Sequence, residues 1–264
     1  AAAQENQKNL NAQIQYQQNF LKNNINLNIH LESNSGVLAQ QEFTYIKVEA
    51  GQGVYKWVDY NGNGIQELDE FEISEFPDEA EYIRVLLPNQ HYVQVNESKY
   101  SQTLSMQIRE WKDLKSWKGF IGKLYNQSSY LVDRKVAKDG SSFHFNPFKD
   151  AGDDQMGLHL NFRNSLFFNR GLPRYTTNYT FMKSENQYLQ VFGLQKNILE
   201  SHQLRFQHKV QEQWVLHQFL STGKNSSSST NFENRNYNLK QYELEPKISY
   251  VPGFNTSIDL YYNY

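Results

Sequence analysis

The segment DYNGNGIQELDE, residues 59–70, contains residues whose types and spacing could bind a metal ion. It fits the calcium-loop pattern D-x-[DN]-x-[DN]-G-x5-E, with Asp59, Asn61, Asn63, Gly64 and Glu70 at the required positions. In such a loop alternate side chains curl around one ion, glycine permits the sharp bend at the sixth position, and the twelfth residue supplies a bidentate carboxylate. The segment therefore predicts a calcium site.

Each predicted ligand has a defined role. The two flanking segments, VYKWV and FEISEF, have the pattern of strands, so the helix–loop–helix of a calcium sensor is not expected. Two asparagines lower the ligand charge, but an affinity of about 10⁻⁴ to 10⁻³ M is adequate outside the cell. We therefore expect a structural calcium clip. Its ligands are the side chains of Asp59, Asn61, Asn63 and Glu70, the backbone carbonyl of Ile65, and Glu67, which binds directly or through water.

A plain turn is the alternative interpretation of the same residues. The pairs Asn61-Gly62 and Asn63-Gly64 are each preferred centres of a type I′ hairpin turn. The acidic residues between positions 67 and 81 would then form only a solvated face. The position of Glu70 within so dense a group of carboxylates favours calcium, because the charges would repel one another without a cation.

Other reactive arrangements are weak, and we expect no enzyme activity. The chain has no cysteine, which excludes thiol catalysis and thiolate metal sites. His202, His208 and His217 are spaced unlike familiar zinc ligands. The segment KDGSSFHFNPFKDAGDD, residues 138–154, holds Ser, His and Asp close together, and we interpret it as a polar loop between strands. A net charge of −2 offers no basic field, so no nucleic-acid partner is expected.

Strand periodicity dominates the chain. Aromatic residues make up 15% of it although hydrophobic residues reach only 38%, which suits strands with one apolar and one polar face. In residues 158–168, Leu158, Leu160 and Phe162 alternate with His159 and Asn161. Several such segments exceed 10 residues, whereas ordinary strands have about 5 or 6. This length predicts an all-β, antiparallel fold, namely a partial outer-membrane β-barrel preceded by a smaller β-rich segment.

The predicted organisation has two parts. Residues 1–90 form the β-rich segment with the EF-hand-like calcium loop, and residues 91–264 form the amphipathic strands of the barrel. STGKNSSSST, residues 221–230, suits a long extracellular loop, and VPG, residues 251–253, a short periplasmic turn. The last segment then runs outward, so we expect further strands after Tyr264. Residues 106–120 could form a short amphipathic helix.

The string GQGVYKWVDYNGNGIQELDEFEI, continued by EYIRVLLPN, resembles a signature of large outer-membrane or cell-envelope proteins of Bacteroidota. RNSLFFNRGLPRY, RNYNLKQYELEPKISY and DLYYNY are similar to the barrel portion of those proteins. The resemblance extends from about residue 40 over most of the chain. It implies an outer-membrane location and a β-barrel, and it implies no catalytic residues.

Two functions from different classes follow. The first is a non-catalytic outer-membrane β-barrel protein with a structural calcium loop, active in transport or envelope assembly. Its expected partners are outer-membrane lipid and other envelope proteins. The alternative is a soluble secreted or periplasmic β-rich module, stabilised by calcium, that serves binding or adhesion.

Overall fold

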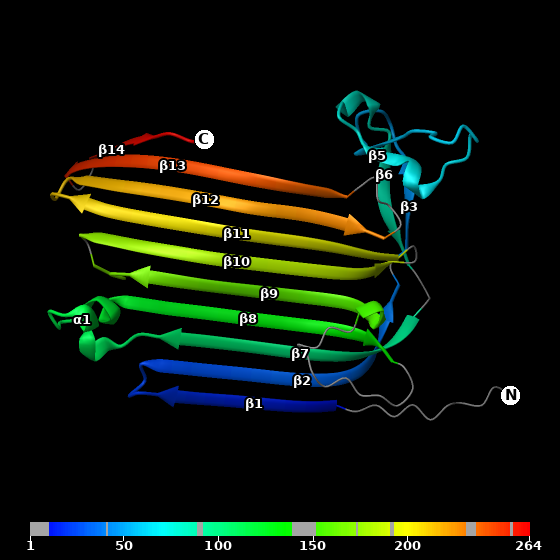
Figure 1. The fold of residues 1–264 in the computed structure, drawn as a ribbon. Helices are drawn as coiled ribbons and strands as arrows, with labels where there is room; N and C mark the ends of the chain where they lie inside the picture. The colour runs from blue at the N-terminus through cyan, green and yellow to red at the C-terminus, as the bar shows by residue number, and fades with distance from the viewer. Residues whose placement is uncertain are drawn as a thin grey trace.

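The computed structural model of the chain consists mainly of long β-strands (Figure 1). It describes residues 11–40, 42–88, 92–138, 152–172, 174–190, 193–230, 236–253 and 256–264. Ten strands form one large sheet in the order β1-β2-β7-β8-β9-β10-β11-β12-β13-β14. They are β1 (Asn11–Phe20), β2 (Ile25–Ala39), β7 (Tyr92–Met106), β8 (Leu124–Ala137), β9 (Gln155–Phe168), β10 (Tyr175–Gln190), β11 (Gly193–Val210), β12 (Trp214–Ser229), β13 (Tyr237–Gly253) and β14 (Thr256–Tyr261).

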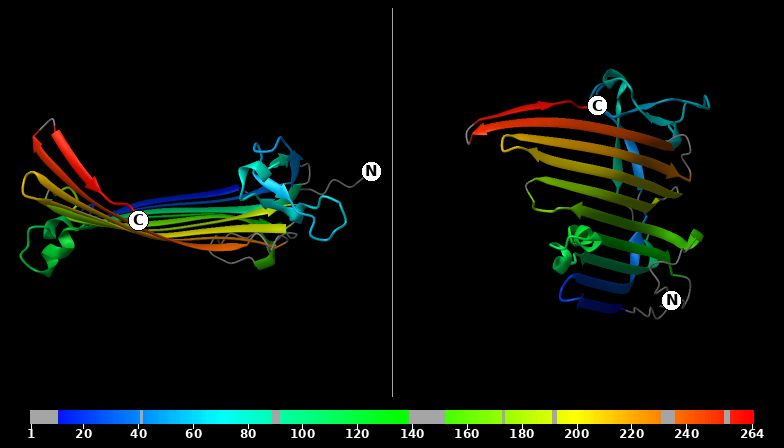
Figure 2. Two further views of the ribbon diagram at one scale, coloured as in Figure 1. Left: turned by 90° about the horizontal axis from the view of Figure 1, so that it is seen from above. Right: turned by 60° about the vertical axis from the view of Figure 1, so that its left-hand side comes forward.

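All pairs of neighbouring strands in the large sheet are antiparallel. The predicted all-β, antiparallel class is therefore confirmed. The sheet is a single twisted layer (Figure 2). Among the described residues it is open, with β1 and β14 at its two edges and no pairing that closes it into a barrel.

A second, smaller sheet is inserted between β2 and β7. It has the order β3-β6-β4-β5, and its strands are joined through two short 3₁₀ helices. The predicted division at residue 90 groups β1 and β2 with this sheet, but both strands belong to the large sheet, where β2 pairs with β7. The elements of the insertion are β3 (Glu42–Lys47), β4 (Tyr55–Trp57), η1 (Leu68–Glu70), β5 (Phe71–Ile73), η2 (Pro77–Glu79) and β6 (Tyr82–Leu87).

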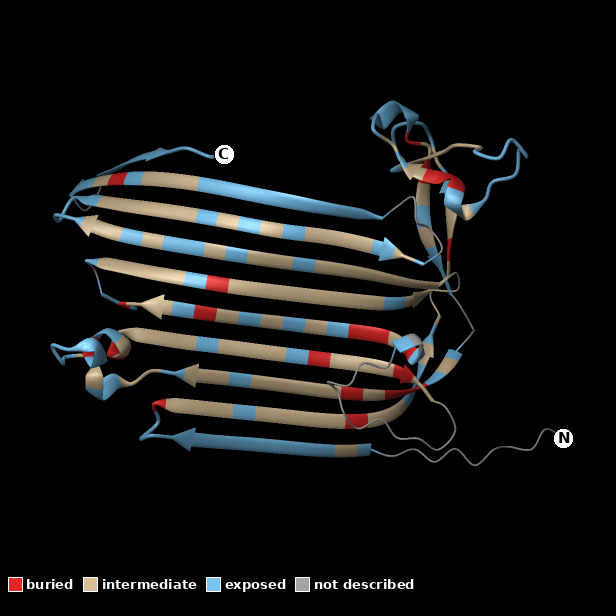
Figure 3. Ribbon diagram, in the orientation of Figure 1, coloured by how far each residue is buried: buried red, intermediate tan, exposed pale blue. Residues whose placement is uncertain are grey.

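The small sheet has a compact aromatic core. Phe43, Phe71 and Tyr82 are buried, and the rings of Tyr45 and Phe71 stack at a centroid distance of 4.1 Å. Phe71 also meets the ring of Tyr82 edge-on at 5.0 Å. In Figure 3 the large sheet is mostly half-buried, because one layer of strands has no second layer to cover it. The small sheet therefore holds a large share of the fully buried apolar side chains.

The register of the large sheet places alternate side chains on two faces, and neighbouring rows near the middle of the strands differ in polarity. Directly paired residues point to the same face, since side chains alternate along each strand. One row of paired residues runs across β9 to β13 on the apolar face: Leu166, Tyr179, Leu204, Leu220 and Leu244. The neighbouring row on the opposite face is Ser165, Thr180, Gln203, Ser221 and Glu243.

The apolar face ends at charged residues toward the serine-rich end of β12. Lys183 of β10 lies directly opposite Glu200 of β11, with 3.4 Å between Nζ and Oε1. Two residues further along, Lys196 Nζ lies 2.6 Å from Glu185 Oε1. These four residues share the parity of Tyr179 and Leu204, so ion pairs bound the apolar rows on this side of the sheet.

Two local predictions are changed by the structure. Residues 221–229 are not a loop but the second half of β12, because they pair with β11 throughout and with β13 as far as Ser227. The segment after β7 contains η3 (Arg109–Trp111) and α1 (Trp117–Gly122) in place of one longer helix. A further 3₁₀ turn, η4 (Gly152–Asp154), precedes β9. No helix within the described ranges is long and apolar enough to cross a membrane.

Candidate calcium-binding loop

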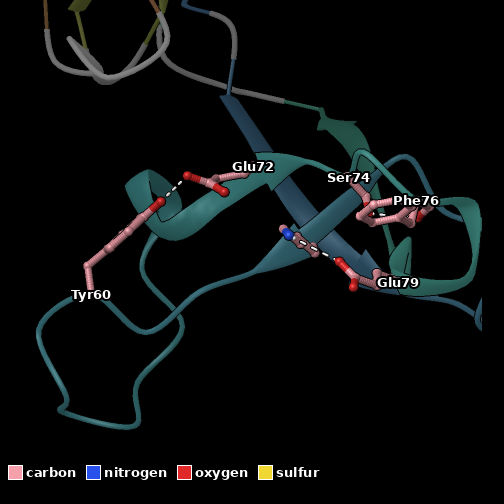
Figure 4. A network of polar contacts seen from close by, with 6 residues as sticks. Tyr60, Glu72, Ser74, Phe76 and Glu79 are labelled. Atoms are coloured by element: carbon pink, nitrogen blue, oxygen red, sulfur yellow. Dashed lines mark hydrogen bonds and ion pairs between the residues drawn. The ribbon is translucent and has the colours of Figure 1, made fainter.

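The candidate loop closes the hairpin of β4 and β5. Trp57 pairs with Phe71 in register, and the Val58 N–H donates a hydrogen bond of 2.8 Å to the Glu70 carbonyl oxygen. Residues 59–70 are therefore closed at their base by backbone hydrogen bonds. Beyond this base the chain extends away from the small sheet (Figure 4). This confirms the prediction that strands, and not helices, flank the segment.

Three side chains fold the loop by accepting backbone N–H groups. Asp59 accepts from Gly62 at 2.7 Å through Oδ1 and from Gly64 at 2.8 Å through Oδ2. The Oδ1 atoms of Asn61 and Asn63 each accept from the backbone N–H two residues on, at 2.9 and 2.6 Å. The two asparagine bonds are Asx turns, which form locally from short side chains, whereas Asp59 reaches three and five residues ahead. The first, third and fifth positions of the loop therefore turn their oxygens toward the same coil of backbone.

The two glycines permit this path. Gly62 has a φ of +72° and Gly64 a φ of +71°. A side chain in this left-handed region is strained by about 1–2 kcal/mol, which glycine avoids. The Asn-Gly pairs therefore shape the turns of the loop, and the side-chain oxygens of Asp59, Asn61 and Asn63 stabilise them by accepting backbone N–H groups.

Glu67 lies among the asparagine amides. Its Oε2 accepts from Asn61 Nδ2 at 2.7 Å, and its Oε1 accepts from Asn63 Nδ2 at 3.4 Å. Hydrogen bonds therefore link the predicted ligands at positions three, five and nine, whereas Asp59 at position one is bonded to the backbone of Gly62 and Gly64. A cation in this place would take over the role of the amide donors toward Glu67.

Glu70 connects the loop to the small sheet. Only 2% of its surface is exposed. Its Oε2 accepts from Trp57 Nε1 at 2.8 Å and from the Glu67 N–H at 3.3 Å. Its Oε1 is buried and has no hydrogen-bond partner among the described residues. A buried acceptor without a partner costs about 1–3 kcal/mol, more when it is charged, so this oxygen is available for a cation.

The donor set fits a hard cation. Every predicted donor is a carboxylate, amide or carbonyl oxygen, the type that Ca²⁺ binds. Ile65 donates its N–H to Asn63, and its side chain is exposed. Over the described ranges, no group of three or more His, Cys, Asp or Glu side chains is placed to hold a metal ion. Any calcium site here therefore depends on the amides of Asn61 and Asn63 in addition to the carboxylates.

Several carboxylates near the loop have partners of their own. Lys56 Nζ lies 3.1 Å from Glu79, and Lys47 Nζ lies 2.9 Å from Glu81. The Tyr60 hydroxyl donates to Glu72, and this bond raises the pKa of Tyr60 above its ordinary value (Figure 4). The mutual repulsion expected of this acidic stretch is thus partly relieved by lysines and a phenol.

Trp57 was not among the predicted site residues. Its indole fixes one oxygen of Glu70, which determines the orientation of the other. No local sequence pattern marks Trp57 for this role, because its bond to Glu70 joins residues 13 apart.

The three histidines considered as zinc ligands do not share one face of the large sheet. His202 accepts or donates a hydrogen bond of 2.8 Å with the Tyr179 hydroxyl, and His208 lies opposite Tyr175. His217 has the other parity and lies on the polar face. Most of the Ser, His and Asp residues between positions 138 and 154 lie outside the described residues. Comparison with protein-family models, with curated proteins and with solved structures gives no match for this chain.

Proposed function

We propose that the large sheet is part of the wall of an outer-membrane β-barrel and that the small sheet is a calcium-stabilised domain at its outer end. The observation that carries this proposal is the contrast between the two rows of residues on β9 to β13. No element of the described part of the chain covers a row of four leucines and a tyrosine, while the row one residue away is entirely polar.

Lipid is the solvent that suits such an uncovered face. Each residue of the apolar row keeps more than a third of its surface exposed. Exposed apolar surface of this extent costs about 25 cal/mol per Å² in water and nothing comparable in hydrocarbon. Outer-membrane strands carry an apolar band about 25 Å tall, or roughly eight residues. The ion pairs of Lys183 and Lys196 would then lie beyond the band, where water is available.

The polar face would line the interior. Arg163, Arg205 and Lys209 have the parity of Gln203 and therefore lie on that face. A basic residue facing lipid at mid-membrane would cost about 2–4 kcal/mol, but a water-filled lumen solvates it. Glu212, which breaks the alternation of its segment, belongs to the turn between β11 and β12. Its charge therefore lies at the end of the strands.

The calcium loop would act as a structural clip. Asp59, Asn61, Asn63 and Glu67 would hold the ion, together with the free Oε1 of Glu70 and the Ile65 carbonyl. When bound, calcium supplies a point of attachment for several oxygens at once. Because Glu70 begins the return to β5, the ion would link the exposed coil to the aromatic core of the small sheet. The function is thus structural, in transport or envelope assembly, and not catalytic.

The resemblance of residues 51–73 and of the later segments to envelope proteins of Bacteroidota supports the same location. A soluble secreted or periplasmic binding module is the second candidate. It is favoured by the small sheet, which has its own buried core of Phe43, Phe71 and Tyr82 and does not require lipid.

Membrane extraction distinguishes the two candidates. Membranes from cells that produce the full chain fused to an export signal would be washed with high salt and with alkaline carbonate, and then extracted with detergent. The barrel proposal expects the chain to stay in the membrane pellet until detergent is added. Release by salt or carbonate alone would contradict it and would favour the soluble module.

A further inference from the structure

A cleft lies where the small sheet meets the end of the large sheet. Its volume is about 550 Å³, within the range of about 300–1,000 Å³ typical of small-molecule sites. One wall comes from β3, β4, β5 and β6, and the other from the ends of β10 to β13. Figure 1 shows the small sheet beside these strand ends. The cleft is distinct from the calcium loop and from the apolar rows.

The small-sheet wall is largely apolar. Tyr55 and Ile73 line it, with the buried rings of Phe43 and Phe71 behind them. Tyr237 lines the facing wall and keeps 44% of its surface exposed. Aromatic rings offer flat apolar surface to a ligand that has a C–H face.

The large-sheet wall is made of amides and hydroxyls. Gln190 Nε2 donates to Gln195 Oε1 at 2.8 Å, and Ser227 Oγ donates to Asn197 Oδ1 at 2.7 Å. Each of these groups can both donate and accept, since an amide carries two N–H donors and two acceptor sites. The wall therefore suits a ligand whose own groups also do both, as hydroxyls do.

The charges of the described lining residues balance. Glu72 and Arg84 each line the small-sheet wall, and the described residues of the large-sheet wall include no Asp, Glu, Lys, Arg or His. An anionic ligand such as an acidic peptide or a nucleic acid would find one cation offset by one carboxylate. A neutral ligand carries no charge that the Glu72 carboxylate would repel.

From the apolar small-sheet wall, the amide-rich large-sheet wall with its exposed Tyr237, and the balanced charges of the described lining, we propose that the cleft binds a neutral oligosaccharide. Sugar rings present C–H faces to tyrosine rings and hydroxyls to amides, and they carry no net charge. This inference goes beyond the proposed function and does not depend on it, because a soluble module would have the same cleft.

Calorimetric titration of the full chain, purified in detergent, tests the proposal. The probes are neutral gluco-, manno-, xylo- and galacto-oligosaccharides of defined length, with an oligogalacturonide as the acidic counterpart. We expect at least one neutral oligosaccharide to bind with a Kd of about 1 mM or tighter and the acidic one to bind more weakly. Absence of binding by all neutral probes, or preference for the acidic probe, would overturn the proposal.

Two variants then locate the binding. Tyr237→Ala removes the exposed ring and Asn197→Ala removes an amide, and we expect each to weaken binding about tenfold or more. Tyr242→Ala is the matched control, because Tyr242 is exposed on the same strand but has the opposite parity. Unchanged circular dichroism would show that the variants fold. Equal affinity in Tyr237→Ala, Asn197→Ala and Tyr242→Ala would refute the assignment to this cleft.

Discussion

The indole Nε1 of Trp57 donates a hydrogen bond of 2.8 Å to Oε2 of Glu70, so the last residue of β4 fixes the last residue of the loop. The second carboxylate oxygen of Glu70 is thereby left buried and without a partner among the described residues. Trp57 thus orients Glu70 so that its Oε1 is available to the cation that the loop is proposed to bind.

This relationship leads to a prediction about calcium. Thermal stability of the parent chain should rise with millimolar calcium, by about 1–2 kcal/mol at ten times the Kd. The double variant Asp59→Ala, Glu70→Ala should lose this increase, because it removes both ends of the ligand set. The measurement is thermal unfolding by circular dichroism across a calcium titration.

Asp78→Ala serves as the control for the loss of an acidic residue, since Asp78 is exposed in η2, outside the loop. It should keep the full response to calcium. An equal response in the parent and in the double variant would end the clip hypothesis, and the Asn-Gly pairs would then act only as turns.

Local features of the fold could be predicted from the sequence. The alternation in residues 158–168 predicts the faces of β9 because the period of two is a property of a single strand. The hydrogen bonds that Asp59 and Asn61 accept from the backbone span only two to five residues, so the loop pattern also predicts them.

Non-local features could not be predicted. Residues 221–229 lack the apolar alternation of a strand, and only their pairing with β11 and β13 makes them one. Likewise β2 joins β7 across the whole small sheet. The Trp57–Glu70 bond joins residues 13 apart, and no local rule places an indole against that carboxylate.

A second prediction concerns pH. The hydrogen bond to Glu72 is the main cause that raises the pKa of Tyr60 above its ordinary value of 10.0. Because the folded pKa exceeds the unfolded one, the stabilisation is complete below about pH 10 and is lost as the pH rises through the folded pKa. Tyrosine ring ¹³C NMR should show a late titration for one resonance, assigned by its absence in Tyr60→Phe.

In Glu72→Ala this resonance should titrate at a lower pH than in the parent. Glu75→Ala, which removes another carboxylate on the same segment, should leave it unchanged. If Glu72→Ala and Glu75→Ala shifted the titration equally, general charge and not the specific bond would be its cause.

A third prediction concerns the close approach of two backbone segments in the small sheet. A Cβ at Gly53 would lie 2.5 Å from both the Ala80 carbonyl oxygen and the Tyr82 nitrogen. Both contacts are backbone atoms, so Gly53→Ala must displace β6 and should destabilise the small sheet by about 1–3 kcal/mol. Hydrogen exchange of the β6 amides should therefore accelerate. Gly36→Ala, where a Cβ would meet nothing within 4 Å, should have no such effect on β6.

The last prediction compares two neighbouring residues of β11 that face opposite ways. Leu204 belongs to the apolar row and Gln203 to the polar row. If the apolar face meets lipid, Leu204→Lys should reduce the membrane-inserted fraction, with a cost of about 2–4 kcal/mol near mid-membrane. Gln203→Lys adds the same charge one residue away and should be tolerated, because a lysine is solvated in the lumen. The carbonate-resistant fraction of each variant is the measurement, and equal behaviour of the two would contradict a lipid-facing apolar row.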